Sequence, residues 1–372
     1  MKIRMRLLLL ALLSMPALYG ADMSFSGQFS GWALGNAERG GAQVGFHYLP
    51  EAFGGSPLAS ARLDGTLSLH LRGDYRFSTH EGKSSAQVYR AWVRWSTDRF
   101  EARFGLQKLD FGSALLLRPL MWFDSLDPRD PLHLTSGVSG GMVRWVSPRN
   151  IVIQGWALLG SGKPKGLELF PSPRNSVEFG GRVQFPTPKG EIAVTAHRRK
   201  AELPFSLFAH SGSKTAENRL AVDGKWDLGV GLWFEAARVQ PETRIAGIGT
   251  QKFLTVGTDY TFPLGNGLHV LLEEMWSTID LNLPNVVENH RFAAFQADYA
   301  FSLWDQFAAI YFFDQQRKEL YQYYVWRRTY DNWSINLALL ASPKTAALPF
   351  ARTENALPFQ GNCLFLIIVL NH

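Results

Sequence analysis

Apolar and polar side chains alternate strictly over stretches of this sequence that are longer than an ordinary strand. From Leu67 to Phe77 every second residue is apolar or glycine, and from Thr66 to Ser78 the residues between them are polar. Successive side chains of a strand point to opposite faces, so this segment predicts a strand with one apolar and one polar face. Its length exceeds the roughly 5 to 6 residues of a typical strand and reaches the roughly 9 to 11 that a tilted strand needs to cross a bilayer.

The same alternation recurs along the chain, and each occurrence predicts another long strand. Clear examples occupy residues 87–95, 100–107, 177–185, 191–197, 219–226, 254–262 and 333–339. Within 87–95, the parity places Gln87 on the apolar face together with Ala91. We count about 18 strands, from 23–33 to 361–371, with 16 as the fallback because a Pro- and Gly-rich stretch follows the first pair. Both numbers are even, as in bacterial single-chain barrels.

The connections between these segments alternate between short and long. The short ones are 97–98, 147–150, 186–190, 227–229, 263–267, 302–305 and 330–332. The long ones are 110–139, 160–174, 200–214, 240–250, 279–288 and 341–357. Aromatic side chains lie beside nearly every short turn: Trp95, Phe100, Trp145, Phe185, Trp226, Phe262, Phe301, Trp304 and Trp333. Short periplasmic turns, longer outer loops and an aromatic girdle are typical of an outer-membrane barrel.

The first twenty residues have the order of a secretory signal peptide. Lys2, Arg4 and Arg6 precede an apolar run at 7–13, and small residues follow at 20–21. That run is too short for a transmembrane helix, and so is the longest apolar run after it, at 363–370. We therefore expect a signal peptide at 1–20 and one barrel domain at 21–372. A soluble β-sandwich is the alternative, but sandwich strands are shorter.

Composition adds to this picture mainly through the net charge of the chain. The chain is 46% hydrophobic with a mean hydropathy of −0.09, values that suit an ordinary soluble protein. Loss of the first twenty residues lowers the formal net charge from +6 to +3, which removes most of the argument for a nucleic-acid partner. Cys363 is the only cysteine, so we expect no internal disulfide and no cysteine-bound metal. We also expect no cofactor. The alternation places the apolar half of the chain outward toward lipid and the polar half inward toward water.

Several local motifs add to the alternation. A Gly- and aromatic-rich stretch lies at 25–31, and Arg-Phe-Gly-Leu-Gln at 103–107 leads into Arg-Pro-Leu at 118–120 and an Asp- and Pro-rich segment at 124–131. These motifs resemble those of the bacterial outer-membrane porin-type β-barrel family. The resemblance implies a transmembrane antiparallel up-and-down β-barrel in the cell outer membrane and passive diffusion of small polar solutes. It also implies contact with outer-membrane lipid and the barrel-assembly machinery. A homotrimer is common in this family, but no pattern here identifies a subunit interface.

A barrel of this size encloses an aqueous lumen, whose lining decides what passes. The polar parity of the strands assigns these residues to the lumen: Arg72, Asp74, Arg76, Arg90, Arg94, Glu101, Arg103, Gln107, Arg144 and Arg182. Arg72, Arg90 and Arg103 come from three consecutive strands, so a basic ladder favouring carboxylate or phosphate solutes is predicted. The alternative is that these arginines pair with Glu101, Asp74 and loop carboxylates and only brace the wall.

The longest connection, 110–139, is unusually apolar for an exposed loop. It contains Leu-Leu-Leu at 115–117 and Met-Trp-Phe at 121–123. We predict that it folds inward and narrows the lumen. The residues expected near the constriction are Arg118, Asp124, Asp127, Arg129 and Asp130. Packing against a neighbouring subunit is one alternative. Binding of Ca²⁺ by the three aspartates is another, although the loop lacks the residue spacing of an EF-hand.

An outer-membrane hydrolase is the main rival function, and it would need serine, histidine and an orienting polar group together. His210 lies close to Ser211 and Ser213 in an outer loop, without a recognisable orienting partner, and the HExxH motif is absent. The sequence therefore predicts no catalytic residue. An exporter of polysaccharide or another solute, and a non-conducting structural barrel, stay open as alternatives. The exporter predicts a wide, strongly basic lumen, and the structural barrel predicts no conductance.

Overall fold

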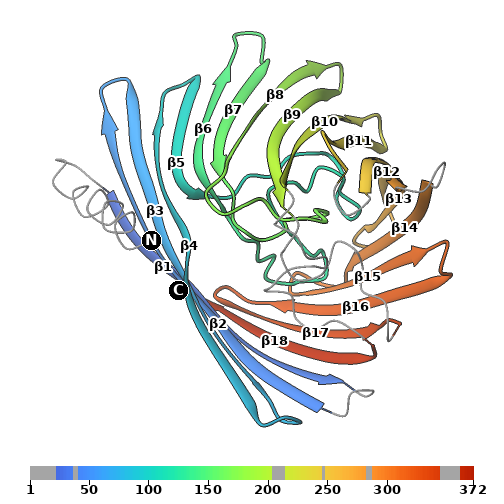
Figure 1. Ribbon diagram of the computed structural model, residues 1–372. Helices are drawn as coiled ribbons and strands as arrows, with labels where there is room; N and C mark the ends of the chain where they lie inside the picture. Colours follow the sequence, from blue (N-terminus) through green and yellow to red (C-terminus); the bar gives the residue numbers. More distant parts are fainter. Residues whose placement is uncertain (1–21, 37–40, 203–213, 245–247, 282–286, 344–360) are drawn as a thin grey trace.

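The computed structural model describes residues 22–36, 41–202, 214–244, 248–281, 287–343 and 361–372, and these contain eighteen strands (Figure 1). The expected signal peptide at 1–20 and the segment from His210 to Ser213 lie outside the described residues. The strands are β1 (Asp22–Asn36), β2 (Gly41–Leu58), β3 (Ala61–Arg76), β4 (Glu81–Ser96), β5 (Phe100–Gln107), β6 (Val138–Val146), β7 (Val152–Leu159), β8 (Val177–Thr187), β9 (Gly190–Glu202), β10 (Lys214–Asp227), β11 (Gly231–Pro241), β12 (Ile248–Phe262), β13 (Leu268–Leu281), β14 (Val287–Ala300), β15 (Asp305–Asp314), β16 (Glu319–Thr329), β17 (Trp333–Ala341) and β18 (Cys363–Asn371). None of the described residues forms a helix long and apolar enough to span a membrane.

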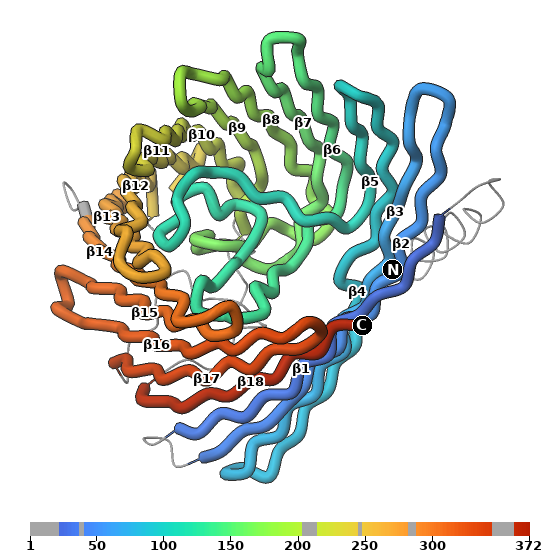
Figure 2. Tube along the Cα trace, turned by 180° about the vertical axis from the view of Figure 1, so that it is seen from behind, coloured from blue at the N-terminus to red at the C-terminus, as the bar shows by residue number. Residues whose placement is uncertain are grey.

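Each strand pairs antiparallel with its neighbours in sequence, and the first and last strands close the sheet. β1 pairs with β18 from Gln28 opposite Asn371 to Asn36 opposite Cys363. The two opposite views in Figures 1 and 2 show the sheet wrapped into a barrel. The predicted all-β, up-and-down barrel is therefore confirmed, with 18 strands in the described part of the chain rather than the fallback of 16.

In many strands the two faces differ sharply in exposure. In β18, the exposed fractions of Leu364 and Leu366 are 55% and 38%, whereas that of Phe365 between them is 0%. Large apolar side chains therefore cover the outer face, as contact with lipid requires. The aromatic residues beside the short turns also lie exposed, between 41% and 60%, for Trp95, Trp145, Phe185, Phe262, Phe301 and Trp304.

Two long connections fold into the barrel (Figure 2). The first inward loop, residues 108–137, joins β5 to β6, and the second inward loop, residues 160–176, joins β7 to β8. The first takes the inward course expected of 110–139, two residues earlier at each end because β5 stops at Gln107 and β6 begins at Val138. Leu117 and Phe123 of this loop are 0% and 2% exposed.

The expectation of a polar interior is wrong for the wall formed by β14 to β18 and β1. Inner side chains of this wall form one buried apolar cluster, which includes Trp32, Leu34, Phe292, Ile310, Phe312, Tyr323, Leu340, Phe365 and Ile367. Leu116, Leu117 and Met121 of the first inward loop belong to the same cluster. An apolar inner wall is stable here because an apolar loop covers it in place of water.

A β-bulge in β4 corrects one predicted orientation. The register between β3 and β4 shifts between Ser68 and Leu69, because Ser68 lies opposite Arg90 and Leu69 lies opposite Val88. The extra residue exchanges the two faces on its N-terminal side. Gln87 therefore faces inward and its amide contacts His70, whereas the unbroken alternation placed it outward.

Candidate functional site

Two glutamates of the strands hold the first inward loop against the inner wall. Glu273 of β13 accepts hydrogen bonds from the successive backbone N–H groups of residues 115–117, at 2.6 to 2.9 Å. Glu235 of β11 accepts hydrogen bonds from the N–H groups of Ala114 and Leu120, at 2.8 and 3.1 Å. These five hydrogen bonds from successive and nearby backbone N–H groups give the first inward loop a defined position in the lumen.

The charged residues expected at the constriction pair with one another inside this loop. Arg118 lies 2.8 Å from Asp124, and Arg129 donates two hydrogen bonds to Asp127, at 3.0 and 2.8 Å. All four side chains are largely buried, with exposed fractions from 1% to 13%. Burial raises the pKa of Asp124, although the neighbouring Arg118 lowers it. These pairs shape the loop, and they do not present open charges to the lumen.

Asp130 stabilises a turn of the same loop. Its two carboxylate oxygens accept hydrogen bonds from the N–H groups of Leu132 and Leu134, both at 3.0 Å. Burial raises the pKa of Asp130 to about 6, against the lowering effect of these two hydrogen bonds. Within the described ranges, no three acidic, histidine or cysteine side chains are grouped as a metal site would require. The aspartates of the loop therefore lack a Ca²⁺ ligand set.

Most arginines assigned to the lumen are ion-paired with wall carboxylates. The pairs are Arg72 with Asp74 (3.3 Å), Arg94 with Asp64 (2.7 Å), Arg103 with Glu101 (2.7 Å) and Arg182 with Asp223 (2.6 Å). Asp64 and Asp223 are buried and each accepts two parallel hydrogen bonds from its arginine. At these positions the geometry favours pairing over an open basic ladder.

The other residues that the sequence pattern assigned to the lumen differ in their surroundings. Arg90 is 8% exposed and donates to the backbone carbonyl of Thr135, at 3.0 Å, so it fastens the end of the first inward loop. Gln107 is fully buried where that loop begins. Arg76 and Arg144 are exposed, and neither has an ion pair with another described residue.

A second charged cluster joins the inner wall of β9 and β10 to the second inward loop. Its members are Glu168 of the loop and Arg199, Glu217 and Arg219 of the strands, with exposed side-chain fractions between 1% and 4%. Arg199 continues the polar parity of 191–197, so an extension of that pattern would find it. Glu168 lies in a connection without periodicity, and no sequence signal indicates its partners.

Two cavities border the first inward loop. A cavity of about 340 Å³ is lined by Asp110 and Arg118 among others, and one of about 410 Å³ is lined by Lys225 and Asp259 among others. Leu115 borders both cavities and its exposed fraction is 53%. The first cavity is lined by residues of the loop itself, and the second lies between the loop and the ends of β10 to β12.

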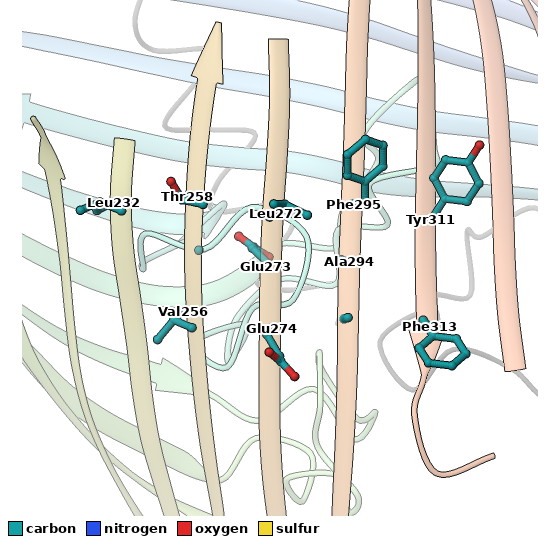
Figure 3. Close-up of a pocket in the computed structure, with 12 residues that line it drawn as sticks. Leu232, Val256, Thr258, Leu272, Glu273, Glu274, Ala294, Phe295, Tyr311 and Phe313 are labelled. Carbon is teal, nitrogen blue, oxygen red and sulfur yellow. The ribbon is translucent and has the colours of Figure 1, made fainter. Parts of the chain in front are cut away.

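A further concavity, of about 520 Å³, lies on the outer face across β11 to β15 (Figure 3). Leu272 and Phe313 on its border are 50% and 38% exposed, like other outward side chains. Glu273 points away from it toward the first inward loop, whereas Glu274 is on the outer face and pairs with Arg291. This groove faces lipid and is separate from the interior.

Comparison with known proteins supports the fold. No protein-family model and no curated protein matches the sequence. The chain is similar to OccK5 (OpdH) of Pseudomonas aeruginosa, with a TM-score of 0.57, 11% identity and coverage of 94% of this chain and 97% of that one. It is also similar to the trimer form of OmpT, an outer membrane protein of Vibrio cholerae, with a TM-score of 0.53, 10% identity and coverage of 95% and 100%. For the anion-selective porin from Comamonas acidovorans, the TM-score is 0.50, the identity 11% and the coverage 95% and 100%.

These likenesses extend over almost the whole of each chain. At 10% to 11% identity, what they share with this chain is the fold, which in this chain is a closed antiparallel barrel. The chain therefore has the fold of bacterial outer-membrane porins, and its exterior is that of an outer-membrane protein.

Proposed function

We propose that the protein is a channel for passive diffusion of small polar solutes across a bacterial outer membrane, and not an enzyme. The supporting observation is a closed barrel with an apolar exterior and free space beside an inward loop. The first inward loop narrows the path in this proposal. Its charged residues Arg118, Asp124, Asp127, Arg129 and Asp130 give the constriction its shape.

The finer part of the proposal is a modest preference for anions. Arg76 and Arg144 carry positive charges without an ion pair among the described residues, whereas four of the other assigned arginines are paired with carboxylates. Unpaired fixed charges attract mobile counter-ions, and paired ones do so far less. The preference should therefore depend on a small number of exposed arginines.

Three further expectations belong to this proposal. Residues 1–20 are removed on export, the barrel-assembly machinery inserts residues 21–372 among outer-membrane lipids, and the barrels associate as a homotrimer. The trimer form named for the similar Vibrio cholerae protein supports the last of these.

Planar-bilayer recording of the purified barrel across a tenfold KCl gradient tests the channel and its preference together. We expect ionic conductance with a reversal potential of anion sign, and a smaller one in Arg144→Gln. Arg149→Gln is the matched control, because it removes the same charge from an exposed turn between β6 and β7. Absence of conductance would identify a structural barrel, and passage of a long polysaccharide would identify an exporter. A reversal potential of cation sign would overturn the anion preference alone.

A further inference from the structure

A row of hydrogen-bond donors crosses the outer face of the barrel from β11 to β14. Arg238 of β11 lies opposite Lys252 of β12 in the register, and Thr278 and Asn289 continue the same line on β13 and β14. Arg238 and Lys252 are exposed, whereas Ala237 next to Arg238 is 5% exposed, so the row points away from the lumen. Opposite side chains of paired strands lie roughly 5 Å apart, so the two positive charges form one local patch.

This donor row marks the border of the apolar outer face. On the side toward the short turns, the outward side chains of β11 and β12 next to the row are Leu232, Phe234, Ala236, Leu254 and Val256. On the side toward the long connections, the next outward side chain of β11 is Gln240, which is exposed. The row therefore lies where lipid headgroups meet the apolar strands on the long-loop side of the membrane.

The two cations of the donor row have no ion pair with another described residue, although carboxylates lie on the same rim. Those carboxylates have other partners: Glu202 pairs with Lys214, Glu242 with Arg198, Glu274 with Arg291, Asp280 with Arg244 and Glu288 with His290. Residues 203–213, 245–247 and 282–286 of the adjoining connections contain no Asp or Glu. Arg238 and Lys252 are thus available to an external anion.

The groove of about 520 Å³ on the outer face adjoins the donor row on its short-turn side (Figure 3). Val256, which lines the groove, is the second outward residue after Lys252 on β12. Leu272 and Phe295 lie opposite each other and continue the groove across β13 and β14. Its volume is within the roughly 300 to 1,000 Å³ of ligand sites, and its walls are mainly apolar, so it suits a hydrocarbon chain.

We propose that the donor row and the adjoining groove bind one phosphorylated lipid of the outer leaflet, with its phosphate on Arg238 and Lys252 and an acyl chain in the groove. Arginine and lysine both bind phosphate, and the hydroxyl of Thr278 and the amide of Asn289 supply further donors. A two-fold contact with a second copy of this chain would place the two cations against the same two cations, so this face favours lipid. The site lies outside the lumen, and the proposal does not depend on the channel function.

Native mass spectrometry of the purified barrel in detergent tests the site, because it counts the lipids that each chain retains. The probes are dioleoylphosphatidic acid and dioleoylphosphatidylcholine, which have identical acyl chains, and only the first has a net negative charge. Each basic residue near an anionic lipid strengthens binding roughly fivefold, so we expect one retained phosphatidic acid per chain and an about 25-fold preference over phosphatidylcholine. Equal retention of the two lipids would overturn the proposal.

Charge variants test whether the donor row holds the phosphate. Combined Arg238→Gln and Lys252→Gln should abolish the preference for phosphatidic acid. Combined Arg198→Gln and Lys214→Gln is the matched control, because it removes the same charge from exposed cations of the same rim that already have carboxylate partners. The control should keep the preference, and equal losses in the two double variants would refute a site at the donor row.

A neutral variant tests the groove. Ala293 lines the groove, so Ala293→Leu fills part of it and should lower retention of phosphatidic acid severalfold with the charge unchanged. Ala297→Leu is the control, because Ala297 has the same parity on β14 and lies outside the lining. Retention in Ala293→Leu equal to that of the wild type would refute the acyl-chain site. A change in the number of chains per complex, in place of a loss of lipid, would identify this face as an interface between copies and would also overturn the proposal.

Discussion

Buried acidic side chains of this barrel differ in their partners, and the partner decides what each contributes. Asp64 faces the guanidinium of Arg94, and Glu273 faces three backbone N–H groups and the indole of Trp233. Asp130 accepts two backbone hydrogen bonds and has no ion pair within the described residues. Its negative charge is thus poorly compensated, and its ionisation should oppose folding.

The stability of the protein should therefore depend on pH through Asp130. Its pKa is raised from 3.8 to about 6 in the folded protein, so the folded state binds this proton more tightly than the unfolded state. The stabilisation is present in full below pH 3.8 and is lost as the pH rises through about 6. This shift corresponds to about 3 kcal/mol at most.

Asp130→Asn removes this titration. Urea unfolding in detergent at pH 4 and pH 7 should show the variant gaining stability relative to the wild type as the pH rises, by up to about 3 kcal/mol. Titrations elsewhere in the barrel affect both proteins equally. A difference between variant and wild type that stays constant from pH 4 to pH 7 would contradict the expectation.

At the scale of residues, the sequence predicts on which face of the sheet a side chain lies, but not which other residue it contacts. Alternation placed Arg94 inward, and the register that brings Asp64 opposite it belongs to the pairing of β3 with β4. The same parity failed at Gln87, because a single bulged residue exchanges the faces beyond it. Local periodicity carries no information on such an insertion.

At the scale of elements, the two inward loops meet where Gly166 of the second packs against the backbone carbonyl of Met121 in the first. Gly166 of the second loop has φ +48, and a Cβ at this position would lie 1.8 Å from the carbonyl oxygen of Met121 in the first loop. No residue with a side chain fits there without separating the loops. The contact therefore depends on glycine for its conformation and for its size.

Gly166→Ala should separate the inward loops. Gly162→Ala is a matched control, because Gly162 also has a positive φ, +75, but its nearest neighbouring side-chain atoms are 3.6 Å away. The control carries only the left-handed strain of about 1 to 2 kcal/mol, whereas Gly166→Ala adds the clash. Trypsin digestion and hydrogen exchange should show residues 108–137 opening more than tenfold faster in Gly166→Ala. Equal opening in the two variants would show that the loops do not depend on this contact.

The two loops also differ in how far the sequence predicted them. The apolar run around Leu116 indicated that the first loop must be buried away from water, and its inward course follows from that requirement. The second loop is polar, and Lys165 and Glu168 resemble the charges of any exposed connection. Its inward position depends on opposite charges of the wall, which are distant in sequence.

At the scale of the whole molecule, the interior has two unlike halves. The wall from β3 to β10 carries charged pairs, and the wall from β14 to β18 and β1 carries an apolar cluster that the first loop covers. Removal of that loop should therefore have two consequences. It should widen the path for ions, and it should expose apolar surface to the lumen.

Replacement of residues 113–134 by a short Gly-Ser linker tests both consequences. The linker can close the gap because β5 and β6 are adjacent strands. We expect single-channel conductance to rise severalfold and a hydrophobic dye to bind inside the barrel. Replacement of the 77–80 connection, which joins β3 and β4 outside the inward loops, should change neither quantity. Unchanged conductance after removal of the first loop would show that it is not the constriction.

The sequence by itself determined the long strands, the lipid-facing side of most of them and the even-numbered barrel, because alternation with a period of two is a local property of an extended chain. Only the tertiary structure decided what fills the barrel. Arg199 and Arg219 meet Glu168, and the apolar inner wall meets Leu117, through contacts between strands and aperiodic loops. Such contacts depend on closure of the sheet, which brings distant charges and apolar surfaces together and leaves no pattern along the chain.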